Sequence, residues 1–260
     1  QARLPWISSI DKKIEKSTLS KASHLVSVTP SWVQRYQERI GVETSLIYNG
    51  YEPKMFEADD NESTQSVSND SVGKFHIVYS GSMSYHQRPT LFFEAIKELI
   101  TANNTPKELK VTFIGNYAPF LSNMVAEYGL ESLVEFVPFG SMQTAVSYMK
   151  AADMLLINGV QGEDDGVIPS KLFDYFGARK PILAFDLSGN AESLLRESGQ
   201  GYSFHVSKDS PSKVASIILD VMKVGYSTVK SEFDPTIYSR EAQTQQLAKI
   251  FDDVWSRRHH

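Results

Sequence analysis

Three polar side chains at the start of a predicted helix have the types and spacing to bind a ligand. Ser170 and Lys171 follow the 12-residue segment NGVQGEDDGVIP, and Asp174 lies one helical turn further on. The N–H groups of a helix start attract an anion such as a diphosphate, and Lys171 adds a positive charge there. Asp174 lies near the same helix face and can accept hydrogen bonds from two adjacent hydroxyls, as on a ribose. The alternative is an ordinary helix whose Lys–Asp pair contributes about 0.3 kcal/mol.

A second candidate site is the segment SGSMSYHQRP, which follows the apolar stretch FHIVY. Gly81 and Ser82 allow the backbone to approach a ligand closely. Arg88 can pair with a phosphate, although a strand-to-helix turn with a solvated arginine explains the same residues. Glycines also end further apolar runs of the chain, so we expect these ends to form a cleft.

Several other functions are disfavoured by what the sequence lacks. No G-x-G-x-x-G or G-x-x-x-x-G-K-[ST] follows any predicted strand, which disfavours a dinucleotide dehydrogenase and a P-loop NTPase. The net charge is 26 − 31 = −5, so the chain has no global basic field for nucleic acid. The absence of cysteine excludes disulfides and thiolate metal sites. Asp164 and Asp165 suggest a metal site, but two adjacent loop carboxylates are more often solvated, and we expect no metal.

The candidate residues must be positioned by regular elements, and the sequence alternates apolar strands with helices. This alternation predicts parallel strands joined by helical crossovers. Strands that are apolar on both faces predict a sheet covered by helices on both sides. The expected architecture is a doubly wound, Rossmann-like α/β sheet with C-terminal helices, whose ligands bind at the carboxyl ends of the strands. Strands are expected at 75–81, 109–116, 134–140, 153–159, 180–186 and 201–206, and helices at 89–103, 118–130, 141–152, 170–178, 190–199, 210–225 and 239–256.

The first part of the chain has a pattern of its own. We expect a helix at 9–23, a strand at 24–29, a helix at 30–41, and a strand at 44–50 that the segment YEPKMF continues. The polar segment at 58–73 predicts a surface loop or linker. No apolar run reaches the ~18–20 residues of a membrane span, and the N-terminus lacks the apolar core of a signal peptide. Because the chain lacks an initiating methionine and begins within a pattern, we expect it to be part of a longer protein.

Four stretches, in this order, resemble the C-terminal, donor-binding half of family 4 (group 1) glycosyltransferases. ASHLVSVTPSWVQRYQERIGVETSLIYNGYEPKMF is similar to the end of the family's N-terminal domain and its linker. IVYSGSMSYHQRPTLFFEAIKELI is similar to the family's glycine loop and the helix after it. KVTFIGN and VEFVPFGSMQTAVSYMKAADMLLI are similar to the central strands, and VIPSKLFDYFGARKPILAF is similar to the signature around the second acidic residue. The resemblance implies the two-domain glycosyltransferase B-type fold.

This resemblance implies a division of the chain and roles for single residues. Residues 1–56 correspond to the end of the N-terminal acceptor domain and the interdomain linker, 57–74 to a polar flexible loop, and 75–260 to the donor-binding domain with C-terminal helices. Asp174 aligns with the second acidic residue, which holds the ribose. Lys171 and Arg88 are the implied catalytic cations, because they can stabilise charge on the leaving diphosphate. The other implied donor-binding residues are Gly81, Ser82, Phe139, Gly140, Ile168, Pro169 and Ser170.

The sequence departs from the family pattern at two positions. The phosphate-binding lysine of the glycine loop is replaced by Gln87. Either Arg88, next to it, substitutes for that lysine, or the site relies on Lys171. The first acidic residue is expected eight positions before Asp174, where the chain has Gly166. Asp164 and Asp165 lie close by, so a shift of one residue would restore a carboxylate.

The implied activity is the retaining transfer of a sugar from a UDP-, GDP- or ADP-sugar to a glycan or lipid-linked acceptor, without a cofactor. The subgroup resemblance implies bacterial surface polysaccharide synthesis in the cytoplasm, with peripheral attachment to the inner membrane face through the missing N-terminal domain. Because that domain is absent except for its last elements, we expect this chain alone to transfer little or no sugar.

Two rival functions remain open at this point. A nucleotide-sugar 2-epimerase shares the fold but needs carboxylates and histidines in the cleft. The histidines at 24, 76, 86 and 205 are widely scattered in the sequence, which does not favour that reaction. The second rival is a module that binds a nucleotide or a partner protein without chemistry.

Overall fold

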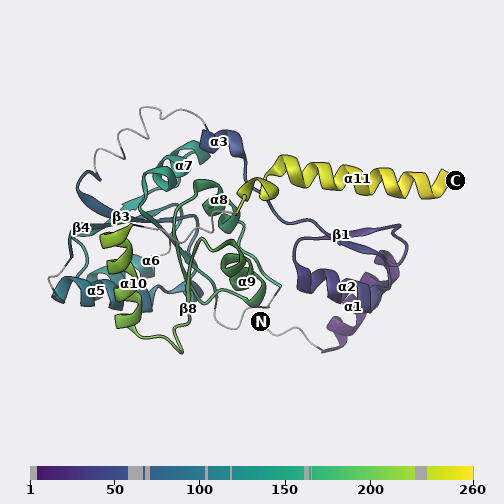
Figure 1. Cartoon of the computed structure of the whole chain (residues 1–260). Helices are drawn as coiled ribbons and strands as arrows, with labels where there is room; N and C mark the ends of the chain where they lie inside the picture. The colour runs from purple at the N-terminus through teal and green to yellow at the C-terminus, as the bar shows by residue number, and fades with distance from the viewer. Residues whose placement is uncertain are drawn as a thin grey trace.

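A six-stranded parallel sheet with helices on both faces forms the larger part of the molecule (Figure 1). A computed structural model of the chain describes residues 5–57, 67, 71–102, 105–117, 119–160, 164, 166–225 and 233–259. Within them the strand order is β5-β4-β3-β6-β7-β8, and every neighbouring pair is parallel. The doubly wound α/β sheet is therefore confirmed. Its strands are β3 (Lys74–Ser80), β4 (Glu108–Ile114), β5 (Val134–Val137), β6 (Met154–Asn158), β7 (Ile182–Phe185) and β8 (Gly201–Phe204).

Helices cover both faces of the sheet because its strands are apolar on both faces. In the central strand β6, Met154 and Leu156 belong to one hydrophobic core, and Leu155 and Ile157 belong to the other. Each of these buried side chains contributes about 1.5–3 kcal/mol, and together they fix the strands relative to the helices. The first core is closed by α5 (Thr90–Ala102), α6 (Pro119–Tyr128) and α10 (Pro211–Val224), and the second by α7 (Met142–Ala151), α8 (Lys171–Ala178) and α9 (Gly189–Ser198).

Two glycines allow the carboxyl ends of β3 and β4 to pass close to each other. Gly81 has φ 114° and Gly115 has φ 131°, a region that side chains rarely tolerate. The N–H of Gly81 donates to the carbonyl of Ile114 at 2.8 Å, and the N–H of Gly115 donates to that of Val137 at 3.0 Å. A Cβ on Gly115 would lie 2.5 Å from the carbonyl oxygen of Gly81. The strand ends can therefore approach this closely only without side chains at these positions.

A smaller lobe precedes the sheet domain. It contains α1 (Pro5–Leu19), β1 (Leu25–Ser27), α2 (Pro30–Ile40) and β2 (Thr44–Leu46), and its two strands are parallel. The first helix lies four residues earlier than expected, since Pro5 has no N–H to lose at a helix start. The last helix, α11 (Arg240–His259), extends alongside this lobe (Figure 1). Arg257 donates to Glu43 at 2.5 Å, which ties the end of the chain to the lobe.

The expectation that YEPKMF continues the strand at 44–50 is wrong. The segment instead forms a short helix, α3 (Pro53–Glu57). A proline cannot donate to a strand ladder, and its fixed φ suits the first turn of a helix. Tyr51 pairs with the chain just before α11, and its ring contacts Phe56 with 5.6 Å between centroids. Of the expected polar loop at 57–74, most residues lie outside the described part of the chain.

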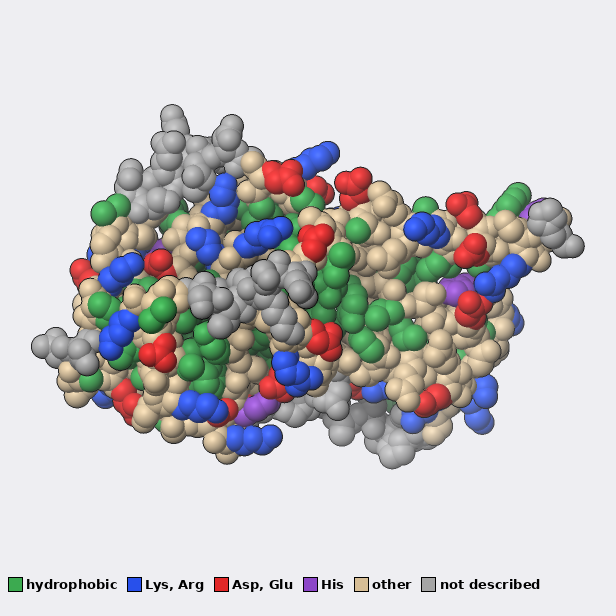
Figure 2. Space-filling model, viewed as in Figure 1, with side chains coloured by type: hydrophobic (Ala, Val, Ile, Leu, Met, Phe, Trp, Pro, Cys, Tyr) green, Lys and Arg blue, Asp and Glu red, His purple; other side chains and the backbone are tan. Residues whose placement is uncertain are grey.

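The surface shows where apolar side chains reach solvent. Figure 2 shows hydrophobic side chains in the hollow between the sheet domain and the smaller lobe. On the sheet domain, Phe139 and Met142 are 73% and 41% exposed, close to the carboxyl ends of the strands. Among the described residues, no helix combines the length and the apolar character that crossing a membrane requires.

Candidate functional site

A cavity of about 280 Å³ lies at the carboxyl ends of β3, β4 and β5, with α7 and α8 forming its walls. Seven of the ten residues predicted from the sequence line it, and they come from three separate parts of the chain. These seven are Gly81, Ser82, Phe139, Gly140, Ser170, Lys171 and Asp174. The fold thus brings the glycine loop and the first turn of α8 to one cavity.

Three predicted residues do not line this cavity. Ile168 is 8% exposed and packs in the second hydrophobic core. The carbonyl of Pro169 accepts the N–H of Leu172 at 3.0 Å, so Pro169 takes part in the hydrogen bonding at the start of α8. Arg88 lines a different cavity together with Tyr85 and His86. The predicted donor contacts of these three residues stay predictions.

Lys171 is the cation of the cavity. Its ammonium lies 2.7 Å from the hydroxyl of Tyr79, to which it donates, and 3.5 Å from the carbonyl oxygen of Ser82. It also lies 3.9 Å from the centroid of the Tyr79 ring, a favourable cation–π distance. No carboxylate pairs with it in the described part of the chain, and burial lowers the pKa of Lys171 to about 7. An anion in the cavity would restore its charge.

Asp174 is the carboxylate of the cavity. Burial raises the pKa of Asp174 to about 6, and the positive charge of Arg240 opposes this shift. Near pH 7 most of the group is therefore ionised and can accept hydrogen bonds. A partly buried carboxylate that keeps its charge gains from hydroxyl donors, which replace the water it has lost.

The first turn of α8 offers backbone donors. Ser170 has helical φ −58° and ψ −33°, its side chain makes no capping hydrogen bond, and its hydroxyl is exposed. The N–H groups of Leu172 and Phe173 bond to the carbonyls of Pro169 and Ser170. Among the described residues, no acceptor bonds the N–H groups of Ser170 and Lys171. Two backbone donors, a hydroxyl and an ammonium thus lie together at a helix start.

Two tyrosines that the sequence interpretation missed hold this arrangement. The Tyr79 hydroxyl accepts from Lys171 and donates to the carbonyl of Ser82 at 2.7 Å, so it links α8 to the glycine loop. The Tyr175 hydroxyl accepts the N–H of Ser80 at 2.9 Å and donates to the carbonyl of Leu156 at 3.0 Å. The only signal in the sequence is their position, since Tyr79 ends the strand before Gly81 and Tyr175 follows Asp174.

Gln87, which stands where the family has a lysine, makes a structural contact. Its amide nitrogen donates to the carbonyl of Asn158 at 2.9 Å, and its amide oxygen accepts the N–H of Ser84 at 3.0 Å. The side chain therefore ties the glycine loop to the carboxyl end of β6. In this arrangement Gln87 does not line the cavity.

The position expected to hold the first acidic residue is filled from the smaller lobe. A Cβ on Gly166 would lie 2.1 Å from the indole nitrogen of Trp32. Trp32 donates to Asp164 at 3.3 Å, and Arg35 donates to the same carboxylate at 3.0 Å. The pKa of Asp164 is lowered first by the N–H of Gly166 and then by Arg35. Asp164 thus binds α2, and Asp165 lies outside the described residues.

We expect Gly166→Asp to destabilise the protein by about 1–3 kcal/mol, because the indole of Trp32 must move away from the new side chain. When Trp32 is already replaced by alanine, Gly166→Asp should cost less stability than it does in the parent, since the clash is removed. Urea unfolding of the four proteins of this double-mutant cycle measures the coupling free energy. Additivity holds within roughly 0.3 kcal/mol, so a coupling free energy smaller than this would show that the contact does not affect stability.

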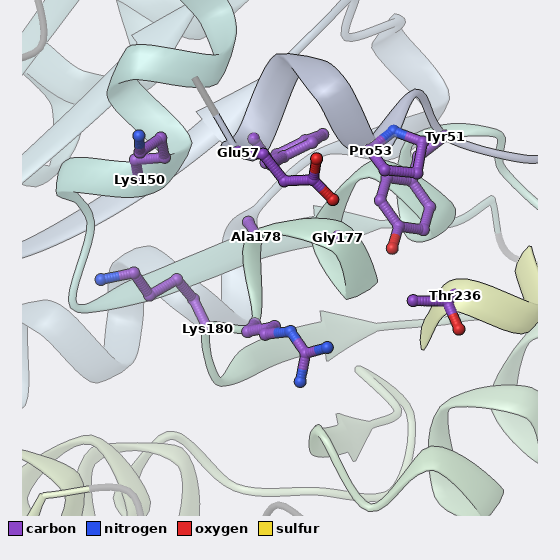
Figure 3. A pocket seen from close by; sticks show the side chains of 10 residues that line it. Tyr51, Pro53, Glu57, Lys150, Gly177, Ala178, Lys180 and Thr236 are labelled. Carbon is purple, nitrogen blue, oxygen red and sulfur yellow. The ribbon is translucent and has the colours of Figure 1, made fainter. Parts of the chain in front are cut away.

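A cavity of about 360 Å³ lies at the opposite, amino end of the strands (Figure 3). Lys150 is in the last turn of α7 and Lys180 lies two residues after the end of α8, so both lie near the carboxyl ends of helices. Cations there stabilise the helix dipoles. In Figure 3 the carboxylate of Glu57 also reaches into this space. Because ligands of doubly wound sheets bind at the carboxyl ends of the strands, we place the functional site at the other cavity.

Comparisons with known proteins agree on one class of fold. The family model described as "Glycosyl transferases group 1" matches residues 60–228. The crystal structure of HepE from Anabaena in complex with UDP superposes with a TM-score of 0.74 at 15% identity, over 95% of this chain and 68% of that one. A glycosyltransferase from Rickettsia africae gives 0.70 at 13% identity, over 98% and 69%. Sucrose-phosphate synthase from Thermosynechococcus elongatus gives 0.64 at 15% identity, over 96% and 62%. No curated protein matches the chain by sequence.

Proposed function

Because the chain belongs to the group 1 glycosyl transferases, we infer that the cavity at the ends of β3, β4 and β5 binds the nucleotide diphosphate of the sugar donor. The observation that carries this proposal is the pairing of Lys171 and Asp174 on one helix start. One is a partly buried cation without a carboxylate partner in the described residues, and the other is a partly buried carboxylate. A nucleoside diphosphate can bind both residues, since it presents an anion and a ribose diol at adjacent positions.

The donor lies along the cavity in a defined direction. The diphosphate contacts Lys171, the N–H groups of Ser170 and Lys171, and the backbone at Gly81. The ribose hydroxyls donate to Asp174, one turn further along α8. The base lies toward Phe139 and Gly140 at the end of β5. The sugar then points away from β5, past β3 toward β6.

The proposed reaction is a retaining transfer of the sugar to a glycan or lipid-linked acceptor. The bond between the anomeric carbon and the diphosphate oxygen breaks, and a bond from the same carbon to an acceptor hydroxyl oxygen forms. The proton of that hydroxyl passes to the departing diphosphate. Negative charge grows on the departing diphosphate, and Lys171 with the backbone donors of α8 stabilises it in place. Among the described residues, no three potential metal ligands lie together.

The two rival functions differ in what they require of the site and of the chain. A 2-epimerase needs histidines in the cleft, and among the described residues none lines the donor cavity. A nucleotide-binding module without chemistry needs only the donor half. Transfer needs an acceptor domain as well, and we propose that this chain alone transfers little sugar. Release of glucose from UDP-glucose by this chain at a normal enzymatic rate would contradict that proposal.

Calorimetric titration of the chain with UDP, GDP and ADP tests the site. We expect at least one of them to bind, and Asp174→Asn to weaken that binding by roughly 5- to 30-fold, because a charged acceptor of the ribose hydroxyls is lost. Asp220→Asn, an exposed carboxylate on α10, is the matched control and should leave the affinity unchanged. Absence of binding by all three nucleotides at millimolar concentration would refute the proposed site. So would equal affinities of the parent and Asp174→Asn.

A further inference from the structure

A second cavity opens at the same edge of the sheet. It has a volume of about 420 Å³ and lies at the carboxyl ends of β6, β7 and β8, beside the start of α5. Its polar lining comes from Tyr85, His86, Arg88, Thr90 and Asp186. It shares no lining residue with the donor cavity, which lies at the ends of β3, β4 and β5. The two cavities therefore lie side by side along the strand order.

One side of the second cavity favours an anion. The guanidinium of Arg88 lies 5.1 Å from the centroid of the Tyr85 ring, and that ring packs edge-on against Phe120 at 5.5 Å. The aromatic contact holds the guanidinium in place but leaves its N–H groups for other partners. No carboxylate forms an ion pair with Arg88 within the described part of the chain. Thr90 begins α5, which has no acidic residue in its first turn, so the positive end of the helix dipole adds to the charge of Arg88.

The opposite side offers a carboxylate. Asp186 directly follows β7 and has φ 48°, an unusual value for a residue with a side chain. One of its oxygens accepts the N–H of Val206 at 3.1 Å and lies 3.8 Å from a ring nitrogen of His205. Its other oxygen has no protein partner among the residues described. This oxygen can accept a hydrogen bond from a ligand hydroxyl.

We propose that the second cavity binds an anionic sugar unit of the acceptor. Its carboxylate or phosphate contacts Arg88 and the first N–H groups of α5, and its hydroxyls donate to Asp186 and bond to Thr90 and His86. This inference rests on the proposed function, because the donor's sugar points from β3 toward β6, and the acceptor must meet it on that side. It also gives a role to Arg88, which lines this second cavity and not the donor cavity.

Chemical-shift mapping on the ¹⁵N-labelled chain tests the proposal. The probes are UDP for the donor cavity, D-glucuronate and glucose 6-phosphate as anionic sugars, and methyl α-glucoside as a neutral one. We expect the anionic sugars to shift the amides at 85–88, at 90 and near Asp186, and the neutral sugar to do so at least tenfold more weakly. UDP should shift the amides at 80–82 and 170–174. Glucuronate and glucose 6-phosphate together show whether the cavity prefers a carboxylate or a phosphate.

Two variants sharpen the test. Arg88→Gln, which keeps much of the side chain but removes its charge, should weaken the anionic sugars by roughly tenfold and leave UDP unchanged. Arg196→Gln, at an exposed arginine of α9, is the matched control and should change neither. Three results would overturn the proposed acceptor site. The anionic sugars could shift only the donor-cavity amides, bind equally to Arg88→Gln, or cause no shifts. If UDP still shifts its own amides, the proposed function survives that outcome; if UDP also fails, the proposed function fails with it.

Discussion

Replacement of Lys171 by methionine is expected to weaken UDP binding by roughly 30- to 150-fold, the equivalent of about 2–3 kcal/mol for a lost hydrogen bond to a charged group. Methionine keeps most of the stem of the side chain but cannot donate to a phosphate. The Tyr79 hydroxyl still donates to the carbonyl of Ser82, so this contact with the glycine loop is kept. Calorimetry at pH 6.5, where Lys171 is mostly charged, measures the effect.

The pH dependence of binding gives an independent signature of the same residue. The pKa of Lys171 is lowered to about 7, and a bound diphosphate favours the charged ammonium, so affinity should fall as the pH rises above about 7. The pKa of Asp174 is raised to about 6, so ribose binding should weaken as the pH falls below about 6. UDP affinity is therefore expected to be highest between these values. Lys171→Met should flatten the alkaline limb and keep the acidic one.

The matched control is Lys97→Met, at an exposed lysine of α5 outside both cavities at the strand ends. It should bind UDP like the parent and keep both limbs of the pH profile. Two results would contradict the role of Lys171. One is an affinity of Lys171→Met within twofold of the parent, and the other is an alkaline limb that persists in that variant.

Replacement of Gly115 by alanine is expected to destabilise the fold by about 3 kcal/mol or more. The new Cβ would lie 2.5 Å from the carbonyl oxygen of Gly81, which is backbone and cannot turn aside as a side chain can. The residue also has φ 131°, a conformation that costs an alanine about 1–3 kcal/mol. Thermal unfolding should show a Tm roughly 6–12 °C below that of the parent.

Gly129→Ala separates the close contact from the backbone conformation. Gly129 also has a positive φ, 69°, but nothing lies within 4 Å of a Cβ built there. Its replacement should cost only about 1–2 kcal/mol, the usual penalty of a left-handed residue. Equal losses of stability in the two variants would show that the approach of Gly115 to Gly81 is not tight in solution.

The strand and helix pattern of the sheet domain could be predicted because it is a local property. Strand β6 is buried on both faces, with Met154 and Leu156 on one side and Leu155 and Ile157 on the other. A strand of this kind can be recognised in the sequence as an unbroken apolar run. Strand ends follow from glycines, and the topology of parallel strands then places the loops at one edge. For this reason most of the predicted donor residues do line one cavity.

The errors and gaps arise where residues far apart in sequence meet. Nothing near Gly166 indicates that Trp32 fills the space of a side chain there, since 134 positions separate the two residues. Arg88 and Gln87 are neighbours in sequence, yet Gln87 is turned toward Asn158 and Arg88 toward Tyr85. The helix at 53–57 was missed because Pro53 fits the first turn of a helix as well as the edge of a strand.

The fit of Trp32 into the space beside Gly166 also constrains how this sequence can change over evolutionary time. With the indole in place, a mutation that gives position 166 an acidic side chain first meets a steric penalty, whatever it would add to sugar recognition. A lineage therefore gains an acid there at a lower cost in stability once position 32 has become small. We expect homologues to carry a bulky residue at one of these two positions and a small one at the other, and seldom bulky residues at both.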